Sequence, residues 1–165
     1  MKKTAISLLT VASLSACAAS LPIETAPVNV TYTNAAASKD IVKMATPTVR
    51  ASKYNADGQS AELSGASCKI QGQGFVATVI TPAVVRIPMK AGPPPNLTVT
   101  CTDGTLTRTR VVSATNLTKQ RIQNSGAGGG LLGALMASAI AAAQDPSNDE
   151  YEFQRISVGL NDRPK

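Results

Sequence analysis

The feature that most constrains the fold is a series of short segments in which apolar and polar residues alternate. The clearest is residues 96–101, where Leu97, Val99 and Cys101 are separated by threonines. A period of two places these three side chains on one face of a β-strand. The Asp103-Gly104 dipeptide that follows favours a tight hairpin turn. The chain is therefore predicted to be mainly β.

Other strand-like segments lie on both sides of this hairpin, and residues 75–80 are a nearly continuous apolar run rich in β-branched residues. Strands are predicted at residues 68–70, 75–80, 84–87, 97–101, 105–113 and 156–160. Pro82 and Pro88 should each end a strand, and the 91–95 loop contains three consecutive prolines that cannot join a sheet ladder. We expect residues 61–165 to form a small antiparallel β-sandwich with a short Gly/Ala-rich helical insertion at about residues 126–143.

Residues 17–60 are rich in Ala, Ser, Thr, Asn and Pro, a composition typical of extended, exposed chain. We therefore predict an extended N-terminal tether that leads into the domain. Within it, residues 27–33 alternate again and place Val28, Val30 and Tyr32 on one face, as in an edge strand.

The predicted insertion carries no charged side chain, and residues 131–143 are good helix formers. A helix over those residues would be about 20 Å long, too short for a hydrocarbon layer of roughly 30 Å. Its bulky face could pack on the sandwich, or the helix could lie in a membrane interface. The third interpretation is self-association through Gly133, Ala137 and Ala141, whose spacing lets two helices approach closely.

The N-terminus carries two lysines, an apolar run and then Leu14-Ser15-Ala16-Cys17. This order resembles the signal peptide and lipobox of bacterial lipoproteins. The resemblance implies that residues 1–16 are removed and that Cys17 receives acyl chains, which anchor a protein durably when there are two or more. Ala18, in place of aspartate, implies sorting to the outer membrane, facing the periplasm.

Two other interpretations of the N-terminus are possible. An ordinary secretory signal cleaved near Ala16 or Ala19 would make Cys17 incidental. A transmembrane anchor fits less well, because the apolar run of residues 5–14 is much shorter than the roughly 20 residues that a spanning helix needs.

The three cysteines are an odd number. If Cys17 carries lipid, Cys68 and Cys101 remain, and in an oxidising periplasm they should form a disulfide. The alternative is a pair of buried free thiols. The chain has no histidine, and neither cysteine lies in a CxxC motif, so we expect no metal site and no cofactor.

The net charge is +6, and it falls to +4 once Lys2 and Lys3 are removed. This mild excess favours contact with anionic lipid or acidic envelope polymers, although solubility alone could also explain it. The basic residues are scattered, so we predict no nucleic-acid binding. The candidate contacts with a partner or an anionic surface are Arg86, Lys90, Arg108 and Arg110.

Few residues suit catalysis. The usual general base is missing, and no serine or cysteine lies in a nucleophile motif. An acidic cluster, Asp145, Asp149, Glu150 and Glu152, could bind calcium or supply paired carboxylates to a hydrolase, but a solvated turn accounts for it more simply. We predict that the protein is not an enzyme.

From Cys68 to Leu160 the motifs follow a definite order. A cysteine strand is followed by Thr81-Pro82, a second strand, a prolyl loop, residues 97–101, Asp103-Gly104, a glycine-rich segment and a last strand. This order resembles a group of small proteobacterial lipoproteins whose β-sandwich domain is loosely related to PEGA-type repeats. The Pro-Glu-Gly-Ala motif itself is absent. The resemblance implies a β-sandwich and assigns no catalytic or ligand residues.

These features together predict a lipid-anchored outer-membrane protein. We expect it to act as a structural or protein-interaction module of the cell envelope, with an envelope protein as its partner. The alternative function is to bind a glycan or another small ligand through the loops of the sandwich.

Overall fold

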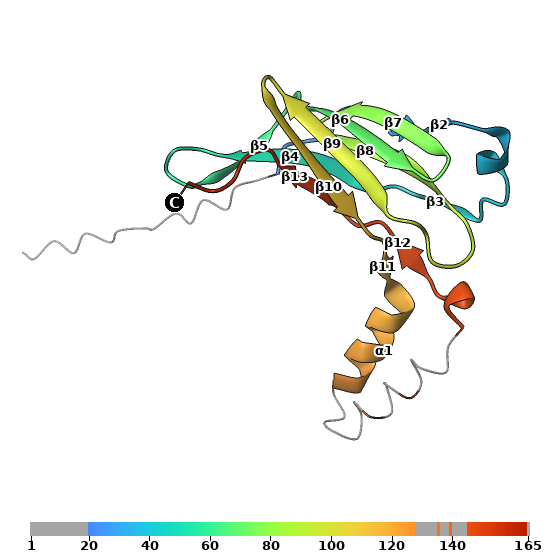
Figure 1. The fold of residues 1–165 in the computed structure, drawn as a ribbon. Coiled ribbons are helices and arrows are strands. Elements are labelled where there is room, and N and C mark those ends of the chain that lie inside the picture. Colours follow the sequence, from blue (N-terminus) through green and yellow to red (C-terminus); the bar gives the residue numbers. More distant parts are fainter. Residues whose placement is uncertain (1–19, 128–134, 136–138, 140–144, 165) are drawn as a thin grey trace, which may run out of the picture.

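The computed structural model describes residues 20–127, 135, 139 and 145–164. Two sheets face each other across one core, and an arm projects from one end of them (Figure 1). Most strand pairs are antiparallel, so the predicted mainly β, sandwich-like fold is confirmed. The predicted signal peptide and Cys17 lie outside the described residues.

One sheet has five strands in the order β10-β9-β6-β7-β2. Alternation in the sequence becomes alternation of burial: in β9, Leu97, Val99 and Cys101 are buried, and the threonines between them are only partly so. The predicted turn at Asp103-Gly104 joins β9 to β10. The strands are β2 (Thr31–Tyr32), β6 (Ser67–Gly72), β7 (Phe75–Ile80), β9 (Leu97–Asp103) and β10 (Leu106–Val112).

The other sheet has six strands, with β1-β8-β4-β13 as its main order, β3 paired to β8 and β5 paired to β4. Its strands are β1 (Val28–Asn29), β3 (Lys43–Ala45), β4 (Thr48–Tyr54), β5 (Ser60–Leu63), β8 (Ala83–Met89) and β13 (Ile156–Gly159). The pairs β1–β8 and β4–β13 are parallel, and the rest are antiparallel.

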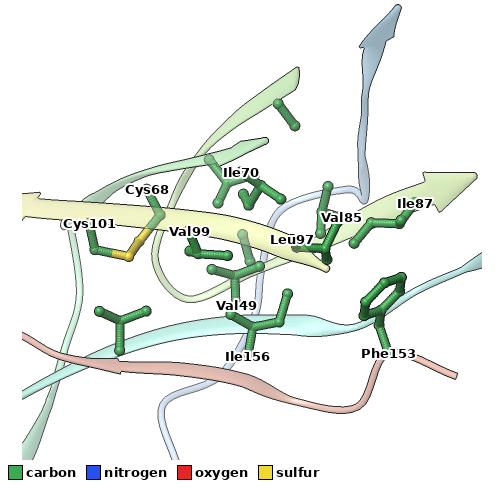
Figure 2. Close-up of a cluster of buried hydrophobic side chains, with 14 of the residues drawn as sticks. Val49, Cys68, Ile70, Val85, Ile87, Leu97, Val99, Cys101, Phe153 and Ile156 are labelled. Atoms are coloured by element: carbon green, nitrogen blue, oxygen red, sulfur yellow. A yellow bond between two sulfur atoms is a disulfide. The ribbon is translucent and has the colours of Figure 1, made fainter. Parts of the chain in front are cut away.

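The core between the sheets consists mainly of valine, isoleucine and alanine, as expected for a chain with two phenylalanines and no tryptophan. Figure 2 shows Val49, Val85 and Ile156 facing Ile70 and Val99 across the gap. Cys68 and Cys101 are opposite each other in β6 and β9 and form the predicted disulfide (Figure 2).

The predicted tether over residues 17–60 is wrong for most of its length. Thr48–Tyr54 forms β4 in the middle of the six-stranded sheet, and Val49 and Ala51 are completely buried. Arg50, between them, is also buried, so burial in β4 does not follow the apolar–polar alternation of its sequence. The folded domain therefore includes β1 to β5 and does not begin at residue 61.

The predicted edge strand at residues 27–33 is present but divided between the two sheets. Val28 pairs with Val85 of β8 in one sheet, and Tyr32 pairs with Phe75 of β7 in the other. Val28, Val30 and Tyr32 are partly buried against the core, so the predicted common face is confirmed.

The helix also differs from the prediction. The α-helix α1 spans Leu117–Ala127, and Asn116 caps its start by accepting a hydrogen bond from the Lys119 amide at 2.8 Å. The predicted helix over residues 131–143 falls largely outside the described residues, together with Gly133, Ala137 and Ala141. No helix in the described part of the chain has the length and apolar character needed to span a bilayer.

The arm consists of β11 (Thr115–Asn116), α1, the 3-10 turn η2 (Pro146–Asn148) and β12 (Tyr151–Glu152). β11 and β12 pair with each other and form the base of the arm. In Figure 1, α1 points away from both sheets. The chain thus leaves the sandwich after β10 and returns to it before β13 along one narrow connection.

Candidate functional site

Two adjacent cavities open at the end of the sandwich where β7 begins and β8 ends. Their volumes are about 460 and 240 Å³, and both are lined by Lys90 and Ala91. We call the two together the prolyl groove, because Pro93, Pro94 and Pro95 form one wall of the larger cavity.

The opposite wall of the larger cavity is the 3-10 turn η1 (Ala35–Ser38). Asn34 caps this turn, since its side-chain oxygen accepts the Ala37 amide at 2.9 Å. Lys90 reaches across the cavity and its Nζ donates to the Ala36 carbonyl at 3.3 Å. The walls are therefore mostly backbone, proline and alanine, with one exposed ammonium between them.

Gly74 sets the distance between η1 and the β6–β7 turn. Its φ is +84°, and a Cβ there would lie 2.5 Å from the Ala37 Cβ. We expect Gly74→Ala to push η1 outward and to lower the free energy of unfolding by more than about 1 kcal/mol, because alanine is strained at positive φ. Urea unfolding and the amide chemical shifts of residues 34–38 would measure both effects.

Gly104→Ala is the matched control for that variant. Gly104 also has a positive φ, +57°, but nothing lies within 4 Å of the position of its Cβ. This variant should lose stability through backbone strain alone, with the amide shifts of η1 unchanged. Equal shifts of η1 in both variants would contradict the contact between Gly74 and Ala37.

The smaller cavity lies where the arm meets the end of β8. Ser147, Asp149 and Tyr151 line it from the arm. Asp149 is buried, and its carboxylate accepts a hydrogen bond from the Asn116 amide group at 2.6 Å. Asp145 accepts the Ser147 amide at 2.9 Å, and this bond lowers the pKa of its carboxyl group. These acidic residues therefore hold the turn η2 and the base of the arm in place.

Glu150 links three parts of the molecule at the base of the arm. Its carboxylate pairs with Arg121 of α1 at 2.8 Å and with Lys43 of β3 at 3.8 Å. The hydrogen bond and charge of Arg121, with a smaller contribution from Lys43, lower the pKa of Glu150. The backbone amide of Glu150 also donates a hydrogen bond to the hydroxyl of Thr118 in α1, at 2.9 Å.

The lowered pKa of Glu150 makes the base of the arm sensitive to acid. A carboxyl group with a depressed folded-state pKa stabilises the fold above its unfolded value, near 4.3, and that contribution is lost as the pH falls through the folded value. We expect the protection factors of the α1 amides, which correct for the intrinsic exchange rate at each pH, to decrease below about pH 4. Arg121→Gln should raise the pKa of Glu150, measured by NMR titration of its side chain, whereas Lys119→Gln should leave it unchanged.

The predicted acidic cluster is thus divided among separate partners. Among the described residues, no three histidine, cysteine, aspartate or glutamate side chains lie close enough together to hold a metal ion. What the prolyl groove offers is a shaped surface with the ammonium groups of Lys43 and Lys90 and the carboxylates of Asp149 and Glu150, suited to binding a polar ligand or a chain segment.

The four predicted contact residues lie on different parts of the sandwich. Arg86 is exposed on the outer face of β8, opposite Asn29 of β1. Lys90 lies in the prolyl groove. Arg108 bonds to Asp162 at 3.1 Å, and Arg110 donates to the Ser157 carbonyl, so both connect β10 to the C-terminal segment. The structure does not bring the four together into one surface.

One polar group was missed by the sequence analysis. Arg50 and Glu62 form a largely buried ion pair on the six-stranded sheet, and both also bond to the backbone of Leu21. The prediction of a tether concealed this pair, because it left Arg50 outside the domain. A buried strand around Arg50 could have been suspected from its neighbours Thr48, Val49 and Ala51.

The prolyl groove and the base of the arm are therefore the candidate functional site, and both lie at the same end of the sandwich. Comparisons of the chain with protein-family models, curated proteins and solved structures found no match.

Proposed function

We propose that the protein is an outer-membrane lipoprotein, acylated at Cys17 and facing the periplasm, that acts as a structural or protein-interaction module of the cell envelope. The order of residues 1–17 supports the anchor, and the disulfide between Cys68 and Cys101 is in keeping with an oxidising compartment. The resemblance to small proteobacterial lipoproteins supports the same proposal.

The observation that carries the interaction role is the arm with its fixed base. Asn116 caps α1 through its oxygen and bonds to buried Asp149 through its nitrogen, so one side chain ties the helix to the return strand. The ion pair between Arg121 and Glu150 adds a second link. An arm that projects from the sandwich and is fixed at its base is suited to present a surface to a partner.

The anchor can be tested through Cys17. The full-length chain with Cys17→Ser should appear in the soluble periplasmic fraction, whereas the unchanged chain should float with outer-membrane vesicles. Mass spectrometry of the mature N-terminus should show acyl chains on Cys17. An unmodified mature N-terminus downstream of this residue would contradict the anchor.

The interaction role can be tested by loosening the base of the arm without removing it. Asn116→Ala should reduce the recovery of a stoichiometric envelope protein in cross-linked, detergent-solubilised pull-downs. Asn124→Ala, on the exposed surface of α1, is the matched control and should leave recovery unchanged. Recovery of no protein partner with the unchanged chain would contradict this role.

A second candidate function is the binding of a glycan or another small ligand in the prolyl groove. The 460 Å³ cavity favours it, because this volume lies within the usual range of roughly 300–1,000 Å³ for small-molecule sites. Lys90→Ala should then weaken the retention of an envelope saccharide, whereas Lys69→Ala, on the outer face of β6, should not.

A further inference from the structure

Two charged side chains bind the backbone of the N-terminal segment at Leu21. Arg50 Nη1 donates to the Leu21 carbonyl at 2.9 Å, and the Leu21 amide donates to Glu62 Oε2 at 3.2 Å. Arg50 and Glu62 also pair with each other, and their side chains are only 11% and 15% exposed. We call this arrangement the Leu21 clamp. It holds both main-chain polar groups of one residue with charge-assisted hydrogen bonds, which are stronger than neutral ones.

The Leu21 clamp lies at the end of the sandwich opposite to the prolyl groove. Leu21 and Pro22 line a third cavity, of about 330 Å³, together with Ile80 and Pro82. The strand β7 begins at Phe75 in the prolyl groove and ends at Ile80 in this third cavity. At about 3.4 Å per residue, β7 separates the two ends by roughly 17 Å.

This end also carries apolar surface. The Ile80 side chain is 56% exposed, which makes it one of the few large apolar side chains in the described part of the chain to face solvent. Pro22 and Pro82 lie around the same cavity. Arg50 and Glu62 neutralise each other, so the clamp adds no net charge, and Glu24 is the acidic residue that lines the cavity.

The chain between Cys17 and the Leu21 clamp is short. Only residues 18–20 separate Cys17 from Leu21. Even fully extended, those four peptide units reach about 14 Å, at no more than roughly 3.6 Å each. An acyl chain on Cys17 would therefore hold the clamp within about 14 Å of the bilayer interface, a distance similar to the thickness of the headgroup layer and its adjacent water.

On the basis of the proposed acylation of Cys17, we infer that the end of the sandwich formed by Leu21, Ile80 and Pro82 lies against the phospholipid surface. The Leu21 clamp fixes this orientation because it binds the chain four residues after Cys17, which leaves only a short connection between the anchor and the domain. The prolyl groove and the base of the arm then point away from the membrane, into the periplasm. The partner of this end is a bilayer interface, contacted by apolar side chains rather than by a basic patch.

The inference can be tested with the lipidated full-length protein in vesicles of phosphatidylethanolamine and phosphatidylglycerol. Single cysteines at Ser64, beside the third cavity, and at Ala91, in the prolyl groove, would each carry a fluorophore. Phospholipids with a nitroxide on the headgroup serve as quencher. We expect several-fold stronger quenching of the Ser64→Cys label than of the Ala91→Cys label.

A linker insertion provides the matched control. Ten residues of glycine and serine between Ala19 and Ser20 leave the clamp and the fold intact but lengthen the connection. Both labels should then be quenched equally and weakly. Equal quenching of the two labels without the insertion would overturn the inference while leaving the anchor in place. Failure of the protein to float with vesicles would overturn the acylation itself, and the inference with it.

Discussion

Replacing both Cys68 and Cys101 with alanine is expected to lower the free energy of unfolding by about 3 to 4 kcal/mol. The two cysteines are 33 positions apart, and closing a loop of that size removes about this much chain entropy from the unfolded state. In the folded state they already face each other across β6 and β9, so the strands should keep their register. Equilibrium urea unfolding of the oxidised protein and of the double variant would measure the difference.

The neighbouring register pair gives the control for this prediction. Ser67 and Thr102 are also opposite each other in β6 and β9, but they are not fully buried and carry no covalent link. The Ser67→Ala/Thr102→Ala variant should change the free energy of unfolding by less than about 1 kcal/mol. A double cysteine variant with the same urea midpoint as the oxidised protein would contradict the stabilising role of the disulfide.

Glu62→Ala is expected to lower the free energy of unfolding by about 2 to 4 kcal/mol, because it leaves the guanidinium of Arg50 largely buried without its counter-charge. It also removes the acceptor of the Leu21 amide. The peptide bonds of residues 20–25 should then become accessible to proteases. Urea unfolding and limited proteolysis followed by mass spectrometry would measure the two effects.

Removing both charges separates the cost of an unpaired charge from the value of the pair. In Arg50→Leu/Glu62→Leu no buried charge is left alone, so we expect a smaller loss of stability than in Glu62→Ala. The N-terminal segment should still be released, because both partners of the Leu21 backbone are gone. A double variant that is less stable than Glu62→Ala would show that the ion pair itself stabilises the fold.

The strands from Ser67 to Val112 could be predicted because each either alternates or is a short apolar run rich in β-branched residues, and each is bounded by a turn or a proline. Proline was a less reliable boundary. Pro88 was expected to end a strand, yet β8 continues to Met89 with Pro88 opposite Met44 of β3. The parallel neighbour β1 pairs only with Val85 and Arg86. The chain therefore needs no amide hydrogen at position 88 to bond to β1.

The N-terminal third was harder to predict, for a physical reason. A strand with a buried arginine looks polar in the sequence, and only the presence of Glu62 on the adjacent strand makes its burial possible. Similarly, α1 has a mostly polar sequence and depends on the cap from Asn116 and the pairing of Arg121 with Glu150. Such long-range partners leave no periodic pattern of their own, so the sequence offers only a weak local indication of β4, from Thr48, Val49 and Ala51, and none of α1.

The candidate site, too, could be predicted only in part from the sequence. The rigidity of the 91–95 loop follows from its prolines, and Lys90 was recognised as a candidate contact. The packing of η1 opposite this loop could not be predicted, because it depends on the contact between Ala37 and Gly74, two residues from separate segments. Arg108 and Arg110 look like free cations in the sequence, but the structure uses both to join β10 to the C-terminal segment.

The parallel pairing of β13 with β4 has a consequence for folding during synthesis. Asn161, just beyond β13, exchanges two hydrogen bonds with the backbone of Tyr54, 107 positions earlier, and Val158 is completely buried. A nascent polypeptide that lacks this stretch has an incomplete interior, and contacts between such remote positions form slowly. The core of the sandwich can therefore close only once residues 156–161 have been synthesised.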